Sequence, residues 1–307
     1  MKAITTFFSV ILITLVSITS VSAQQKASDF DGALLWKVSG NGLSKPSYIL
    51  GTHHLTHVKF IDEIPGLRQA IESTEQTVGE LLMADQTAMS TKIQQAAMMP
   101  AGESYSKLLT AEEYKDLDEG LTKMFTVGLG QFGQMKPGMI SMLYSITMFS
   151  KLDPTFNPMS HEAIDAYVQR VATEKGKPTL GLETVEDQIY ALFEAEPLQD
   201  QAKSLACAVK NEDYGMESLK KLNEYYANKQ LFAMYNLAFN NPDEPCQMSQ
   251  TYQGAINKDR NDKWLAKLPQ IMKEKSNLIA VGALHLAGEE GLLYQLAKRG
   301  YTIEAVK

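Results

Sequence analysis

Histidine is scarce in this sequence, with five residues among 307, and none belongs to a His-Glu-x-x-His motif. That short motif places two zinc-binding histidines and a general base on one helix in many metalloproteases. A peptidase site in this chain would therefore have to be assembled from separate motifs.

The chain also lacks an excess of positive charge, because its formal net charge is −7. This balance argues against nucleic acid or an anionic membrane surface as the main partner. Hydrophobic residues make up 44% of the chain and charged residues 21%, which is typical of a globular protein with a core. No low-complexity linker divides residues 24–307, so we expect one domain.

Only the N-terminus carries a long apolar stretch. Lys2 precedes it, polar residues such as Ser9 and Thr14 interrupt it, and Val21-Ser22-Ala23 ends it. This pattern predicts a signal peptide over residues 1–23, and a transmembrane anchor is the weaker alternative. We therefore expect an exported protein, periplasmic or extracellular, with no stable membrane span after cleavage. In that setting Cys207 and Cys246 are expected to form a disulfide, with two buried thiols as the alternative.

Strand patterns lie towards both ends of the mature chain. Residues 33–42 and 46–54 read as a hairpin, and short strands are expected within 76–83, 177–184, 277–286 and 301–307. Residues 84–176 are mostly helical in pattern, including a helix from Ser160 to Gly176 and one capped by Thr110. The expected fold is α/β, with a central mixed sheet and a large helical insertion at about 84–176 that forms a lid.

Two segments far apart repeat the same order of features. "YILGTHHL" and "LIAVGALHL" are both apolar strands that end in Gly-x-x-His, and a loop, a helix and a strand follow each. The matched residues are Gly51 with Gly282 and His54 with His285. Ligands bind at the carboxyl ends of strands in open α/β sheets, so the two histidines are predicted to face one cleft.

Imidazole is the commonest metal ligand and the usual general base near neutral pH. Two histidines with a carboxylate would form a three-ligand metal site for hydrolysis. The alternative is that each histidine is a hydrogen-bonded core residue. His53 is expected on the opposite face from His54 if the strand continues, and His57 and His161 are expected to be surface or supporting residues.

The segments "YILGTHHL", "VGEL", "GLETVEDQ", "DRNDKW" and "VGALHLAGEEGLLYQLAKRGYTI" resemble, in this order, the TraB/GumN family, which includes the Tiki metalloproteases. The resemblance implies a fold related to the erythromycin-esterase and ChaN-like proteins. It also implies a divalent metal, manganese or cobalt rather than zinc, held by His54, Glu80 and His285.

The same resemblance places Glu80 and Arg260 among the catalytic residues with both histidines. Glu80 would bind the metal or take a proton from water, and Arg260 would stabilise an oxyanion or hold a substrate carboxylate. An ion pair of Arg260 with Asp259 or Asp262 is the structural alternative. Glu183 is a further carboxylate candidate or has a helix-capping role with Thr184, while Asp165 is expected to position a loop.

The leading interpretation is an exported, metal-dependent, peptidase-like hydrolase that acts on a peptide or protein. Two alternatives remain open at this point. One is a metal-independent esterase-type hydrolase that uses a histidine and a glutamate. The other is a non-catalytic protein that binds a ligand, haem or a peptide.

Overall fold

A computed structural model describes residues 25–83 and 86–307. The signal peptide expected over residues 1–23 lies outside this part of the chain. A mixed sheet of six strands has the order β4-β3-β5-β2-β1-β6, which confirms the α/β class. The strands are β1 (Leu35–Gly40), β2 (Ser47–Thr52), β3 (Gln76–Gly79), β4 (Thr179–Gly181), β5 (Asn277–Gly282) and β6 (Tyr301–Ala305).

The two strands that carry the Gly-x-x-His motifs are neighbours at the centre of the sheet. β2 pairs with β5 in parallel, with Thr52 opposite Gly282, and β3 pairs with β5 on its other side. β1 forms the expected antiparallel hairpin with β2. Residues 277–281 of β5 are buried, as a central strand covered on both faces requires. Because β2, β3 and β5 run in parallel, their carboxyl ends meet at one edge of the sheet.

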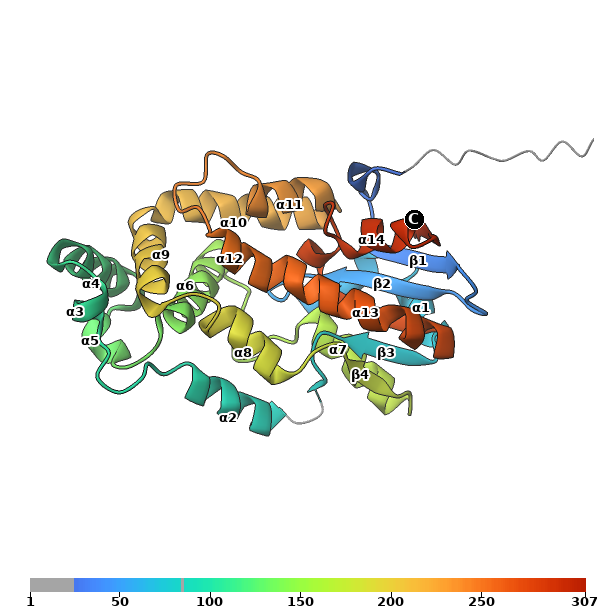
Figure 1. The fold of residues 1–307 in the computed structure, drawn as a ribbon, viewed down its shortest axis with the longest axis horizontal. Coiled ribbons are helices and arrows are strands. Elements are labelled where there is room, and N and C mark those ends of the chain that lie inside the picture. Colours follow the sequence, from blue (N-terminus) through green and yellow to red (C-terminus); the bar gives the residue numbers. More distant parts are fainter. Residues whose placement is uncertain (1–24, 84–85) are drawn as a thin grey trace, which may run out of the picture.

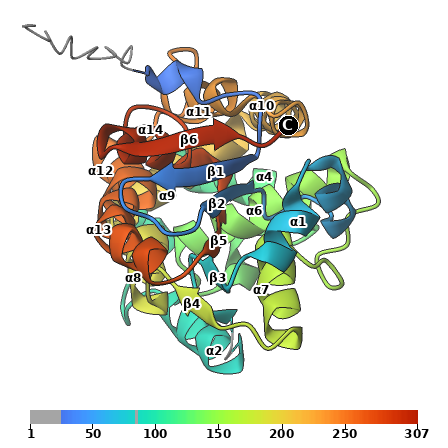
Figure 2. The same ribbon diagram turned by 90° about the vertical axis from the view of Figure 1, so that its right-hand side faces the viewer.

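Helices cover both faces of this sheet. Figure 2 shows α1 (Leu67–Ser73) and α7 (Ile164–Glu174) on one side of the strands, with α13 (Asp259–Glu274) and α14 (Leu292–Lys298) on the other. Their apolar faces form the main core with the strands, through residues such as Leu67, Val168, Trp264 and Leu293. In addition, α13 reaches past the sheet edge towards the helical part of the molecule (Figure 1).

A helical lobe lies at the opposite end of the molecule from the sheet (Figure 1). It contains a second core built around Leu117, Leu121, Ile140 and Leu205. The remaining helices are α2 (Gln86–Ala96), α3 (Tyr105–Leu108), α4 (Ala111–Phe125), α5 (Leu129–Phe132), α6 (Pro137–Leu152), α8 (Val185–Phe193), α9 (Leu198–Lys210), α10 (Glu212–Ala227), α11 (Leu231–Phe239) and α12 (Gln250–Gln253). The second core thus combines residues of the 84–176 segment with α9, which follows that segment in the chain.

Two local expectations have clear outcomes. Thr110 caps α4, with its hydroxyl accepting a hydrogen bond from the Glu113 backbone N–H. The helix expected from Ser160 begins at Ile164 instead. The segment just before the helix contacts the loop after β2, since His161 Nε2 donates to the carbonyl oxygen of His54 at 2.7 Å.

The cysteines form the expected disulfide, which joins α9 at Cys207 to Cys246 in the loop after α11. Over the described residues, no helix has the length and apolar character needed to cross a membrane.

Candidate active site

A cavity of about 310 Å³ opens where β2, β3 and β5 end. The four residues expected to form the site all line it: His54, Glu80, Arg260 and His285. They come from four segments, namely the loops after β2, β3 and β5 and the first turn of α13. The prediction that the two motif histidines share one cleft is therefore confirmed.

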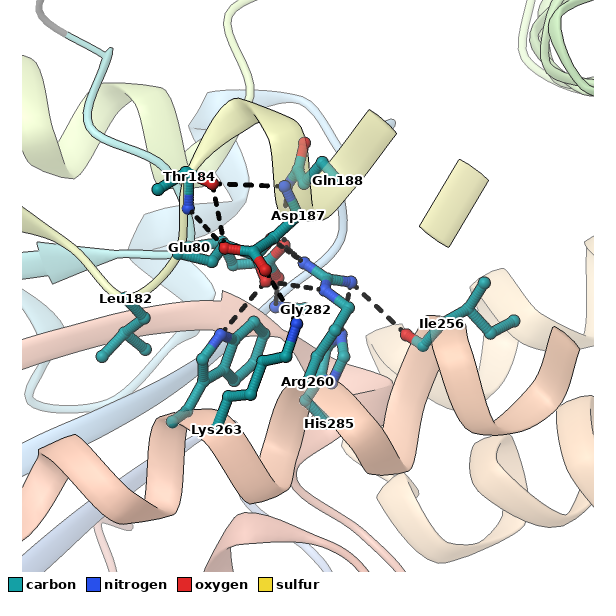
Figure 3. A network of polar contacts seen from close by, with 12 residues as sticks. Glu80, Leu182, Thr184, Asp187, Gln188, Ile256, Arg260, Lys263, Gly282 and His285 are labelled. Carbon is teal, nitrogen blue, oxygen red and sulfur yellow. Dashed lines mark hydrogen bonds and ion pairs between the residues drawn. The ribbon is translucent and has the colours of Figure 1, made fainter. Parts of the chain in front are cut away.

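Arg260 is the centre of the cluster. Its Nη1 donates to His285 Nε2 at 3.0 Å, while Nη2 donates to Glu80 and to Glu183, the latter at 2.7 Å. Its Nε donates to Glu183 at 3.0 Å, and Nη1 also contacts the carbonyl oxygen of Ile256 at 3.4 Å. Figure 3 shows the guanidinium among the labelled partners Glu80, Ile256 and His285. The Arg260 Cζ also lies 4.8 Å from the centre of the Trp264 ring, which adds a cation–π contact to these hydrogen bonds.

The alternative expectation, an ion pair of Arg260 with Asp259 or Asp262, was wrong. Arg260 pairs with two glutamates that lie 180 and 77 residues away in the sequence, and Asp262 pairs with Lys258. A π-helical turn, Gly254–Lys258, directly precedes α13, and Arg260 lies two residues after it. Such turns occur often at functional sites.

Glu80 follows β3 directly and is 8% exposed. Its Oε1 accepts from the Gly282 backbone N–H at 2.7 Å, and its Oε2 accepts from Arg260. A Cβ at Gly282 would lie 3.3 Å from Oε1, so the glycine allows this close approach. Burial alone would raise the pKa of Glu80, but Arg260, His285, His54 and the Gly282 N–H outweigh it and lower the pKa to about 2.

His285 is 6% exposed and neutral near pH 7. Burial, supported by the positive charges of Arg260 and His54, lowers its pKa to about 3. Asn261 donates its amide N–H to backbone carbonyls, which leaves its Oδ1 to accept from His285 Nδ1 at 2.8 Å. This assigns the proton to Nδ1, and Nε2 accepts from Arg260.

His54 lies at the mouth of the cavity, with its side chain 58% exposed. Its Nδ1 donates to Asp165 Oδ1 on α7 at 3.3 Å. The enclosing protein disfavours the charged ring, but the hydrogen bond and charge of Asp165 outweigh that effect and raise the pKa of His54 to about 9. Asp165 was expected to position a loop, and its hydrogen bond to His54 in the loop after β2 agrees with that expectation.

Two further expectations are corrected by the geometry. Glu183 has no capping role, because Thr184 caps α8 with Asp187 while Glu183 accepts from Arg260 and from Trp264 Nε1 at 3.2 Å. His53 also lines the cavity, since β2 ends at Thr52 and the alternation of faces stops there. Burial, with the charges of His54 and His161, lowers the pKa of His53 to about 4.

The expected metal ligands are His54, Glu80 and His285. The Nδ1 of each histidine is held by an oxygen acceptor, which leaves Nε2 as the atom that would bind a metal, as in metal-binding histidines generally. However, Arg260 already contacts the ligand atoms of Glu80 and His285. Among the residues described, no group of three His, Cys, Asp or Glu side chains is placed to hold a metal ion. The three residues therefore do not fit a metal ion while Arg260 occupies this position.

Together, the fold and site define a mixed α/β protein with two strand-end histidines and a buried Glu–Arg pair on one cavity. The chain belongs to the TraB/PrgY/gumN family, whose model matches residues 34–305. It is similar to the "Metalloprotease TIKI2" of Danio rerio, at 21% identity over 320 residues. That match covers 89% of this chain and 60% of the relative. No solved structure matches the chain.

Proposed function

We propose that this protein is an exported peptidase-like hydrolase whose active site is the cavity lined by His54, Glu80, Arg260 and His285. The observation that carries the proposal is the convergence of these four residues from distant segments on one cavity. A relative named as a metalloprotease supports hydrolysis of a peptide bond as the reaction.

In the proposed reaction Glu80 acts as general base towards the attacking water. Its low pKa is due in large part to Arg260, which donates to Oε2. A substrate carbonyl oxygen in the cavity would accept the same N–H groups and draw the guanidinium away from Glu80. The pKa of Glu80 then rises, and the carboxylate becomes a better proton acceptor as the substrate binds.

Arg260 would stabilise the negative charge that develops on the carbonyl oxygen. Glu183 and the neutral His285 hold the guanidinium, so it stays oriented when substrate draws it away from Glu80. His285 orients the guanidinium through Nε2, and Asn261 orients His285 in turn.

His54 would act as general acid towards the leaving amine. With a pKa of about 9 it carries a proton at neutral pH, and Asp165 holds its ring at the mouth of the cavity. Once it has given up this proton, His54 regains it from solvent or from the water proton that Glu80 holds.

The test is incubation of the purified protein with a peptide pool, followed by mass spectrometry of the products. Wild type and His57→Ala are expected to cleave, because His57 only caps a short helical turn outside the cavity. His54→Ala and Glu80→Gln are expected to lose at least about 100-fold in rate, the range for general acid–base groups. Cleavage that survives both substitutions would contradict the proposal.

The same assay separates the two alternatives. Cleavage of carboxylic esters but of no peptide would support the esterase-type hydrolase. An absence of product from both substrate classes, together with tight retention of a ligand, would support a binding protein.

Metal dependence is a further proposal, which one specific observation favours. His54 and His285 both have Nδ1 held by an acceptor, so Nε2 is the atom of each ring that a metal would bind, once His54 has lost its Nε2 proton and Arg260 has left His285. In this version, Arg260 must leave Glu80 and His285 before a divalent ion binds. Elemental analysis of wild type beside His54→Ala and His285→Ala tests it, since metal held by this site is lost in both variants.

A further inference from the structure

Two buried hydroxyl groups in the described part of the chain have no hydrogen-bond partner. They belong to Thr52 and Tyr144, whose residues are each 2% exposed. Leaving a buried hydroxyl unpaired costs free energy, and nearly all buried polar groups in native proteins are paired. Each of these two residues lines a cavity but has its hydroxyl oxygen covered, so a bound molecule would supply the missing partner after a small rotation of the side chain.

Thr52 lines the candidate active site and projects towards its catalytic groups. It lies opposite Gly282 in the parallel pairing of β2 with β5, and paired residues of neighbouring strands point to the same face. A Cβ at Gly282 would be directed at Glu80 Oε1, 3.3 Å away, and at His285 Cδ2, 3.5 Å away. The side chain of Thr52 therefore leaves the sheet on the side of Glu80 and His285.

Tyr144 lines a second cavity, of about 230 Å³, which opens at the surface of the helical lobe between α6, α9 and α10. Its walls are largely apolar and include Met148, Leu205 and Leu219. Small residues create the space, namely Ser141 and Ser145 on α6, Ala208 on α9, and Gly215 and Ser218 on α10. Burial raises the pKa of Tyr144 to about 12, so its phenol remains a proton donor at neutral pH.

The two cavities meet at Leu222 of α10, which lines both of them. A molecule that extends past this residue would reach the catalytic groups with one part and the lobe cavity with another. An extended peptide has the required chemistry, because its carbonyl oxygens accept hydrogen bonds and its side chains project into pockets beside its backbone.

We propose that the substrate is a peptide with an apolar side chain in the lobe cavity, and that Thr52 and Tyr144 donate their hydroxyl hydrogens to its carbonyl oxygens. Thr52 binds the carbonyl at the scissile bond, beside Glu80 and Arg260. Tyr144 binds a carbonyl further along the peptide, beside the side chain that fills the lobe cavity. This assignment rests on the proposed hydrolase and adds a preference for an apolar side chain and two binding residues.

The test compares removal of these unpaired hydroxyls with removal of matched, paired ones. Thr52→Val and Tyr144→Phe delete the unpaired groups. Thr74→Val and Tyr105→Phe delete hydroxyls that donate to the Ala70 and Met135 carbonyl oxygens, each at 2.8 Å. The measurements are the melting temperature and the hydrolysis kinetics of two peptides that differ by leucine or aspartate at one position near the cleaved bond.

Thr52→Val is expected to keep or raise the melting temperature and to lower kcat roughly 10- to 100-fold, while Thr52→Ser retains activity. Tyr144→Phe is expected to keep the melting temperature and to raise KM several-fold with little change in kcat. The two paired controls are expected to lose about 2 °C or more in melting temperature with unchanged kinetics. If the Thr52 and Tyr144 variants instead lose stability and keep wild-type kinetics, the inference is overturned.

Filling the lobe cavity gives an independent readout. Ala208→Phe is expected to raise KM for the leucine peptide at least about tenfold and to remove its preference over the aspartate peptide. Ser204→Phe, one turn earlier on α9 and outside the cavity lining, is the control and is expected to behave as wild type. Equal kinetics for wild type and Ala208→Phe would contradict occupation of this cavity by the substrate.

If wild type cleaves no peptide, the proposed function is contradicted. The present inference is then tested separately, by peptide binding. Calorimetry would then measure binding of a non-hydrolysable phosphinic peptide with a leucine side chain. Weaker binding to Thr52→Val and Tyr144→Phe than to the paired controls supports the inference. Equal binding by all variants, or no binding to wild type, overturns it.

Discussion

The guanidinium of Arg260 lies 3.0 Å from His285 Nε2 and also donates to Glu80, two residues that the family resemblance assigned to a metal. A positively charged side chain thus stands where a positive ion was expected. The site brings a fixed cation, an ionised carboxylate and a neutral imidazole together on one cavity. The stability of the site and its affinity for a metal ion should therefore depend on the contacts that hold Arg260.

Replacing Arg260 should destabilise the fold. Arg260→Gln leaves Glu80 and Glu183 buried without their cation, and breaking such a buried pair costs about 3–5 kcal/mol. Lys263→Met is the control, because the pair of Lys263 with Asp187 is far more exposed and is worth at most about 1 kcal/mol. Urea unfolding at pH 7 measures both changes, and equal losses would show that the buried cluster contributes no more than a surface pair.

Hydrolysis should fall at alkaline pH with the titration of His54. Its pKa is raised to about 9, so the proposed acid is protonated below that pH and is lost as the pH rises through it. Asp165→Asn removes the charge that favours the protonated ring and should move this alkaline limb to lower pH by about one unit or more. The pH dependence of kcat/KM is the measurement. An alkaline limb that stays in place in the variant would exclude His54 as the titrating group.

Stability should fall in acid because two buried groups have lowered pKa values. The pKa of Glu80 drops from 4.5 to about 2 and that of His285 from 6.5 to about 3. Both groups therefore contribute stability above their unfolded pKa values, and that contribution is lost as the pH falls from about 6.5 towards 2. Glu80→Gln should make the free energy of unfolding less dependent on pH below 5, whereas Glu304→Gln on the surface should leave the slope unchanged. Identical slopes in the two variants would contradict the role of Glu80.

Metal affinity should rise when Arg260 is removed. Arg260→Gln frees the ligand atoms of Glu80 and His285, so calorimetric titration with Mn²⁺ or Co²⁺ should show at least about tenfold tighter binding than in wild type. Adding His285→Ala should abolish this gain. Tighter binding by wild type than by Arg260→Gln would show that the arginine does not compete with the ion.

The sequence by itself determined the features that depend on neighbouring residues. The β1–β2 hairpin and the cap at Thr110 follow from turn residues and from a hydroxyl beside a helix start. The meeting of His54 and His285 was also predictable. Two apolar strands with the same ending are expected in one parallel sheet, and their carboxyl ends then share an edge.

Only the tertiary structure decided which partners those residues have. Sequence neighbours were the alternative expectation for Arg260, yet it pairs with Glu80 and Glu183. Likewise, Asp165 comes from α7 to hold His54. The unpaired hydroxyls of Thr52 and Tyr144 are visible only once every possible partner has been placed. Backbone turns and caps involve residues a few positions apart, whereas these side-chain contacts depend on how several loops and helices pack at one edge of the sheet.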